Sequence, residues 1–189
     1  MSKTTLGTIR AAITNRTLVR IVRAGIQTAD REQEGVPVAV GNSWVVFTKM
    51  GDGINLSGFG AVRLNDITTL QTRFERRAFY VSALRMKRAR ISAVPPLDLT
   101  SAATLLKTAQ NWFSLLVVER ELAFPNTVEI GRVTRSMSST VEMRLVSSSA
   151  KSNPRSCRIR VADITAISFG GQYEDALADV AGFEDPGWK

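Results

Sequence analysis

The chain contains the nine-residue stretch VRLNDITTL at Val62–Leu70 and a closely similar stretch, IRVADITAI, at Ile159–Ile167. In both copies a β-branched residue precedes an arginine, and the tripeptide Asp-Ile-Thr begins three residues after that arginine. Asp66 and Asp163 lie 97 residues apart, and every other position of the stretch keeps the same offset. Recurrence at a fixed offset indicates a duplicated supersecondary unit.

Composition favours a folded chain with room for one medium domain or two small ones. The sequence has 189 residues, of which 44% are hydrophobic, and this is enough for a packed core. No run approaches the roughly 18 apolar residues that a membrane-spanning helix needs. The first residues, MSKTT, lack the apolar region of a secretion signal. We therefore expect a cytoplasmic protein with no membrane partner.

The residue types that most enzymes and metal sites use are scarce. There is no histidine, which excludes Ser-His-Asp and Cys-His nucleophile systems. The single cysteine, Cys157, excludes a Cys-cluster metal site and fits a small strand residue. No phosphate-binding glycine loop occurs. We expect no enzyme, no metal and no cofactor, and a carboxylate-based hydrolase is the remaining catalytic alternative.

Positive charge is concentrated in the first half of the chain. The formal net charge is +8, and residues 1–95 carry 15 Lys and Arg against 6 Asp and Glu, whereas residues 96–189 carry 10 against 11. Such asymmetry favours an anionic partner for the basic half, with nucleic acid first. A solvated basic surface without a ligand is the alternative.

Each copy of the repeat closes a series of short strands. In the first copy a helix over residues 5–15 leads into five short apolar runs, separated by a polar loop at 26–35 and by glycine turns. The second copy begins near Leu115 and repeats the pattern. Gly41 and Gly131 are the expected counterparts upstream of the repeat, with a longer Ser-rich loop in the second copy. A short helix at Tyr173–Ala181 and a loose tail follow.

The middle of the chain is helical and basic. Phe74, Ala78, Val81 and Leu84 recur at helical spacing among arginines. Residues 94–97, VPPL, interrupt this helix, and Thr100 is the expected N-cap of a second one. The sequence thus predicts a mainly β (α+β) chain of three parts: residues 1–72 with a leading helix and five strands, a two-helix basic connector at 73–113, and a second five-stranded part at 114–189.

Two short motifs in the first copy resemble signatures of the Sm-like family, whose fold is an SH3-like small barrel. DGINL at Asp52–Leu56 is similar to the first signature, and VRLN at Val62–Asn65 is similar to the second, although Leu64 stands where the family has glycine. The resemblance implies two five-stranded Sm-like barrels in tandem, joined by a helical connector. The whole layout also resembles an uncharacterised family of bacterial proteins with two such units.

The predicted function is a non-catalytic module that binds nucleic acid, RNA rather than DNA, through basic side chains. Phe79 and Tyr80 could stack on bases. If the Sm-like resemblance extends to the ligand, Arg63 and Arg160 face a nucleotide-binding rim; otherwise each pairs with the nearby Asp66 or Asp163. The candidate contact residues are Arg73, Arg76, Arg77, Arg85, Lys87, Arg88, Arg90, Asn55 and Arg63.

Two further readings of the basic helix and of the barrels stay open. The helix over residues 73–90 is alternatively a solvated linker whose aromatic side chains pack between the barrels. The alternative function is a protein-interaction or scaffold module, a homo-oligomer included, that assembles through exposed barrel edges.

Overall fold

The computed structural model describes residues 3–27, 31–51 and 53–183. The chain divides into two compact units, Met1–Val94 and Pro95–Lys189. Asp52, which contributes to the Sm-like signature, and the predicted tail at 184–189 lie outside the described residues. Within the described ranges, no helix has the length and apolar character needed to cross a membrane.

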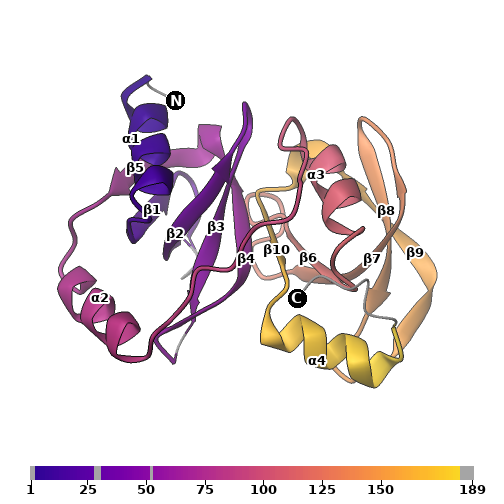
Figure 1. Cartoon of the computed structure of the whole chain (residues 1–189). Coiled ribbons are helices and arrows are strands. Elements are labelled where there is room, and N and C mark those ends of the chain that lie inside the picture. The colour runs from indigo at the N-terminus through magenta and orange to yellow at the C-terminus, as the bar shows by residue number, and fades with distance from the viewer. Residues whose placement is uncertain (1–2, 28–30, 52, 184–189) are drawn as a thin grey trace. The chain divides into compact units, whose positions relative to one another are not determined.

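The first unit is a five-stranded antiparallel sheet with a helix before it and a helix after it (Figure 1). Its strands lie in the order β5-β1-β2-β3-β4, and a single turn of 3-10 helix at Leu64–Asp66 joins the last two strands in sequence. The elements are α1 (Lys3–Thr14), β1 (Val19–Arg23), β2 (Glu32–Val40), β3 (Trp44–Gly51), β4 (Asn55–Arg63), β5 (Ile67–Gln71) and α2 (Arg77–Met86).

The second unit has the same plan. Its antiparallel strands lie in the order β10-β6-β7-β8-β9, and a 3-10 turn at Val161–Asp163 precedes the last strand. The elements are α3 (Ala102–Ala109), β6 (Leu116–Glu119), β7 (Val128–Ser136), β8 (Thr140–Val146), β9 (Ser152–Arg160), β10 (Ala166–Phe169) and α4 (Gln172–Ala181).

The prediction of a mainly β chain with helices is confirmed. The prediction that each unit closes into a barrel is not confirmed. Among the described residues the ladders run from β5 to β4 in the first unit and from β10 to β9 in the second, and no ladder joins these outer strands within a unit. The two helices predicted as one connector also separate, because α2 belongs to the first unit and α3 to the second.

The ladder register identifies which glycines correspond. Val19 pairs with Gly35 in the first unit, and Leu116 pairs with Gly131 in the second. A Cβ on Gly35 would lie 2.2 Å from the Thr48 carbonyl oxygen, and one on Gly131 would lie 2.2 Å from that of Arg144. Both glycines are thus required by close backbone approach. The counterpart of Gly131 is Gly35, and the predicted match with Gly41 is wrong.

The predicted loop at residues 26–35 is also partly wrong, since β2 already begins at Glu32. The charged start of this strand is stabilised by the neighbouring strand: Arg20 on β1 lies 3.3 Å from a Glu32 carboxylate oxygen and 2.8 Å from one of Glu34. Such cross-strand ion pairs let polar residues occupy a strand, and alternation of apolar residues does not reveal them.

The Ser-rich loop is not the longer one. Met50 pairs with Leu56 in the first unit, and Val146 pairs with Ser152 in the second, so both hairpins enclose the same number of residues. The single extra residue lies in β9, on the far side of Ser152. There it widens a register shift that both units have at this point of the ladder.

The leading helices occupy equivalent places. Ile9 and Ala12 of α1 are buried, as are Leu106 and Ala109 of α3, which stand at the 97-residue offset. The helix α1 contacts β2, and α3 contacts β7, the corresponding strand. The N-cap of α3 is Ser101 rather than the predicted Thr100, because the Ser101 hydroxyl accepts a hydrogen bond from the Thr104 N–H in a capping box.

Candidate functional site

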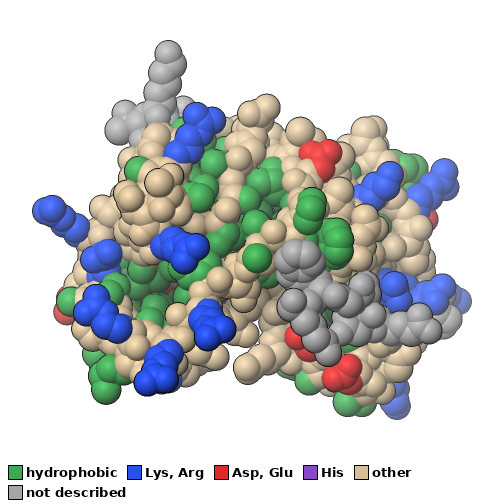
Figure 2. Space-filling model, in the orientation of Figure 1, with side chains coloured by type: hydrophobic (Ala, Val, Ile, Leu, Met, Phe, Trp, Pro, Cys, Tyr) green, Lys and Arg blue, Asp and Glu red, His purple; other side chains and the backbone are tan. Residues whose placement is uncertain are grey.

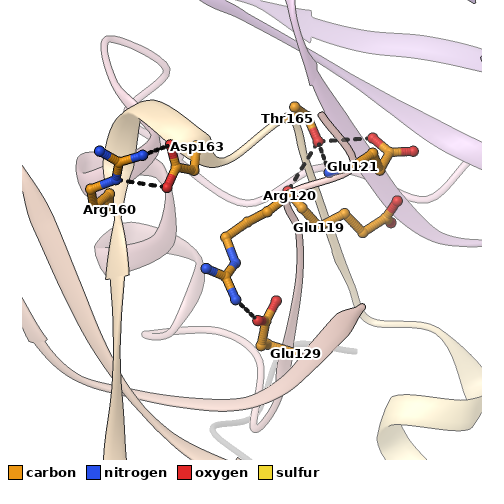
Figure 3. A network of polar contacts seen from close by, with 7 residues as sticks. All are labelled: Glu119, Arg120, Glu121, Glu129, Arg160, Asp163 and Thr165. Atoms are coloured by element: carbon orange, nitrogen blue, oxygen red, sulfur yellow. Dashed lines mark hydrogen bonds and ion pairs between the residues drawn. The ribbon is translucent and has the colours of Figure 1, made fainter. Parts of the chain in front are cut away.

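The side chains of the sequence repeat hold its own turn together in each unit. The Arg63 guanidinium lies 2.7 Å from an Asp66 carboxylate oxygen, and Arg160 contacts both oxygens of Asp163 at 2.8 and 2.9 Å (Figure 3). The hydrogen bond to Asp163 raises the pKa of Arg160 above its ordinary value. The internal ion pair offered as the alternative reading of these arginines is present in both copies.

The repeated threonine joins this turn to the first strand of each sheet. The Thr68 hydroxyl donates to the Val22 carbonyl oxygen at 3.0 Å, and the Thr165 hydroxyl lies 3.1 Å from that of Glu119. Val22 and Glu119 are equivalent in register, since they pair with Thr69 and Ala166. The repeat is therefore a structural signature of the turn that precedes the last strand.

The carboxylates next to this turn in the second unit also have internal partners. The Glu121 carboxylate lies 2.8 Å from the Thr165 hydroxyl, and the Glu121 N–H donates to the same hydroxyl at 3.1 Å (Figure 3). Glu129 forms a largely buried ion pair with Arg120, whose guanidinium stacks on the Phe124 ring at 4.2 Å. These groups stabilise the β6–β7 region.

The predicted contact residues fall into two groups. Asn55 begins β4 and Arg63 ends it, so the nine residues of the strand keep the two side chains roughly 26 Å apart. Lys87 donates to the Gly53 carbonyl oxygen and thus lies beside the turn that leads to Asn55. Arg63, at the other end of β4, is instead engaged by Asp66.

The remaining predicted residues lie on or beside α2. All are exposed except Arg77, which is half-buried and donates to the Leu18 carbonyl oxygen at 3.3 Å. Figure 2 shows Lys and Arg side chains gathered around α2, at the lower left of the view. The exposed members are Arg73, Arg76, Arg85, Lys87, Arg88 and Arg90.

One face of α2 borders an open pocket of about 440 Å³ within the first unit. Four arginines line it, three of them from the predicted set. The fourth, Arg16, comes from the end of α1 and was not predicted, since nothing in the local sequence connects it with α2. The arginines are Arg16, Arg77, Arg85 and Arg88, and the aliphatic lining residues are Leu18, Val36, Leu56, Val81, Leu84 and Ile91.

The charge of this pocket is unbalanced. No Asp or Glu side chain lines it. Over the described part of the chain, no ion pair engages Arg16, Arg85 or Arg88, whereas Arg20, Arg63, Arg120, Arg158 and Arg160 each pair with a carboxylate. Guanidinium groups without a carboxylate partner are suited to binding an external carboxylate or phosphate.

The opposite face of α2 carries aromatic side chains. Phe79 is 60% exposed, and its ring centroid lies 5.8 Å from that of Tyr80. Tyr80 accepts a hydrogen bond from Arg76, which raises the pKa of Arg76 above its ordinary value. The guanidinium of Arg20 lies 4.7 Å from the centre of the Phe74 ring, at the foot of the same helix. The exposed ring of Phe79 thus contacts Tyr80, which itself binds Arg76.

Comparison with family models, with curated proteins and with solved structures gives no match. Within residues 3–27, 31–51 and 53–183 there is no group of three or more His, Cys, Asp or Glu side chains that could hold a metal ion.

Proposed function

We propose that the protein is a non-catalytic binding module for nucleic acid, single-stranded RNA rather than DNA, and that it binds through the outer face of α2 and the segment after it. The observation that carries this proposal is the exposed ring of Phe79 on a helix whose segment, residues 73–90, is rich in arginine. Base stacking on an aromatic ring contributes about 1–3 kcal/mol per base, and cations beside it attract the phosphates.

The charge of the segment supports the same ligand. Residues 73–90 carry seven Lys and Arg, with Glu75 as their one acid. Cations that neutralise several phosphates release counterions, so binding by this surface should weaken steeply as salt increases.

The tandem layout supports an Sm-like relationship for both units, which we propose as their fold family. Each unit has a leading helix, five antiparallel strands and a 3-10 turn before the last strand. The preference for RNA follows from this resemblance, and a cytoplasmic location is part of the same proposal.

The test is fluorescence anisotropy with a labelled mixed-sequence single-stranded RNA at 50 and 200 mM salt. Phe79→Ala should weaken binding about 5- to 100-fold if a base stacks on the ring. Tyr173→Ala is the matched control, because Tyr173 is 54% exposed on α4 of the second unit, beside acidic residues. The proposal fails if the native protein shows no salt-sensitive binding, or if the two variants bind alike.

A scaffold function is the second candidate, favoured by one apolar patch. Leu122 and Phe124, which follow β6, and Val128, the first residue of β7, are all exposed large hydrophobic residues. Light scattering over a hundredfold range of protein concentration distinguishes the candidates: a rise in mass that Val128→Lys abolishes, without RNA affinity, supports assembly through this patch.

A further inference from the structure

The helix that follows the last strand packs differently in the two units. In the second unit, Leu177 and Ala178 of α4 are buried in a core cluster with Leu115 and Val146. In the first unit, α2 buries no residue. Leu18 and Leu115 each directly precede the first strand of their sheet, and Leu18 lines the arginine-rimmed pocket. The pocket therefore borders Leu18, whose counterpart Leu115 packs against α4 in the second unit.

Two of the pocket arginines stand in a backbone conformation that disfavours them. Arg16 has φ 48° and Arg88 has φ 51°, the left-handed region, at the ends of α1 and α2. At each end the next N–H bonds back into the last turn, from Thr17 to Ala12 and from Ala89 to Leu84. This motif usually has glycine at the left-handed position, as α4 does with Gly182 at φ 73°.

Arginine thus occupies both glycine positions that border the pocket. Backbone strain at a residue points to a function when the side chain of that residue lies at a candidate binding site. Both side chains line the same pocket, and no ion pair within the described residues engages either of them. Both strained helix ends therefore place an arginine at the pocket.

The lining defines the chemistry of a ligand. The floor is aliphatic, with no aromatic ring to stack on a base and no acidic group to hold a cation. Its volume of about 440 Å³ is in the usual range for small-molecule sites. We infer that this pocket binds an amphipathic anion, an aliphatic chain that ends in a carboxylate or a phosphate. The chain replaces the side chains that α4 inserts in the second unit, and the arginines bind the head.

This inference does not depend on the nucleic-acid proposal. Three arginines are counted in both sites, but the ring that carries the nucleic-acid proposal lies outside the pocket. Arg77, Val81, Leu84, Arg85 and Arg88 face the pocket, whereas Phe79 does not line it. Single substitutions can therefore separate the two functions.

Isothermal titration of the full chain with decanoate and with decyl phosphate tests the inference and distinguishes the two head groups. We expect saturable binding of one ligand per chain for at least one of them. Decyltrimethylammonium, which has the same chain and a cationic head, and inorganic phosphate, the head alone, should each bind at least 10-fold more weakly. Equal binding of the anionic and cationic decyl compounds, or no binding of either anion, overturns the inference.

Arg88→Gly is the decisive variant. Glycine suits the left-handed conformation, so the variant should keep the thermal midpoint of the native protein while its affinity for the anion falls at least 10-fold. Val81→Glu, which introduces an acidic group at a half-buried lining position, should lower affinity as strongly.

Two matched controls should leave anion affinity within about twofold. Arg90→Gly removes an exposed arginine that does not line the pocket, and Phe79→Ala removes the proposed stacking residue. An Arg88→Gly variant that folds and binds like the native protein overturns the inference. Loss of RNA binding in Phe79→Ala with anion binding intact shows that the two proposals stand or fall separately.

Discussion

The helices α2 and α4 occupy the same place in the two halves of a duplicated chain, yet they differ in charge and in packing. The helix α4 has Glu174 and Asp175 in its first turn and two buried residues, whereas α2 has Arg85 in its last turn and no buried residue. The sheets, by contrast, keep their strand order and, apart from the extra residue in β9, their register. The duplication has thus preserved the framework and let the final helix diverge. The helix α2, which has no buried residue, is the one that borders an open, basic pocket.

The largest expected effect is on the free energy of unfolding, at the glycine that each sheet requires for close backbone approach. Gly35→Val and Gly131→Val should each lower the free energy of unfolding by about 3 kcal/mol, because a Cβ at either position collides with a carbonyl oxygen of the next strand. Urea unfolding measures the change. Gly7→Ala, with open space around the added Cβ on α1, is the control and should stabilise by up to about 1 kcal/mol. Tolerance of valine at one glycine but not the other would break the equivalence of the two sheets.

A smaller effect on the free energy of unfolding is expected in the final helices, α4 and α2, which pack differently in the two units. Leu177→Ala removes a buried side chain of α4 and should lower the free energy of unfolding by about 2 kcal/mol or more. Val81→Ala acts on the corresponding stretch of α2 but should cost less than about 1 kcal/mol, since Val81 is only half-buried beside the pocket. Equal losses in the two variants would show that α2 packs as tightly as α4.

The smallest effect is a pH dependence confined to the start of the second unit. The Thr100 hydroxyl and N–H donate to the Asp98 carboxylate at 2.6 and 2.9 Å, and these bonds hold the pKa of Asp98 below its ordinary value. A carboxyl group with a lowered pKa stabilises the folded state above its unfolded pKa, and this contribution is lost as pH falls through the folded value. Asp98→Asn should therefore lower the thermal midpoint at pH 7, with the difference shrinking below about pH 4.

Thr100→Ala provides the control for that pH dependence. Without the Thr100 hydroxyl, Asp98 loses the larger cause of its lowered pKa, and the acid-dependent part of the Asp98→Asn effect should shrink. An effect of Asp98→Asn that is the same at every pH would show that the charge of the Asp98 carboxylate contributes nothing to stability through its hydrogen bonds with Thr100.

Local patterns were sufficient to predict most of the sheets. Apolar runs and glycine turns located the strands, and the repeated Asp-Ile-Thr marked the turn before the last strand of each copy. The predicted match of Gly41 with Gly131 was wrong because Glu32 and Glu34 are typical of a loop. Their place in a strand depends on ion pairs with Arg20 on the neighbouring strand. A sequence pattern records one strand at a time, whereas ion pairs across a ladder depend on the partner strand.

The candidate site was only partly predictable for a similar reason. The basic segment is visible as composition, and three of the four pocket arginines belong to it. Arg16 is brought to α2 by the fold, and its left-handed conformation follows from the way α1 ends. The equivalence of α2 with α4 was also hidden, because opposite charges made one resemble a connector and the other a terminal helix.

The shared register has a consequence for how the chain folds. Two sheets with the same strand order can exchange strands while they form, and tandem repeats are prone to such misassembly. Each unit is built from one uninterrupted stretch of chain, divided between Val94 and Pro95. The ladders of the first unit can therefore be complete before β6 leaves the ribosome, so that vectorial synthesis keeps the two copies from trading strands.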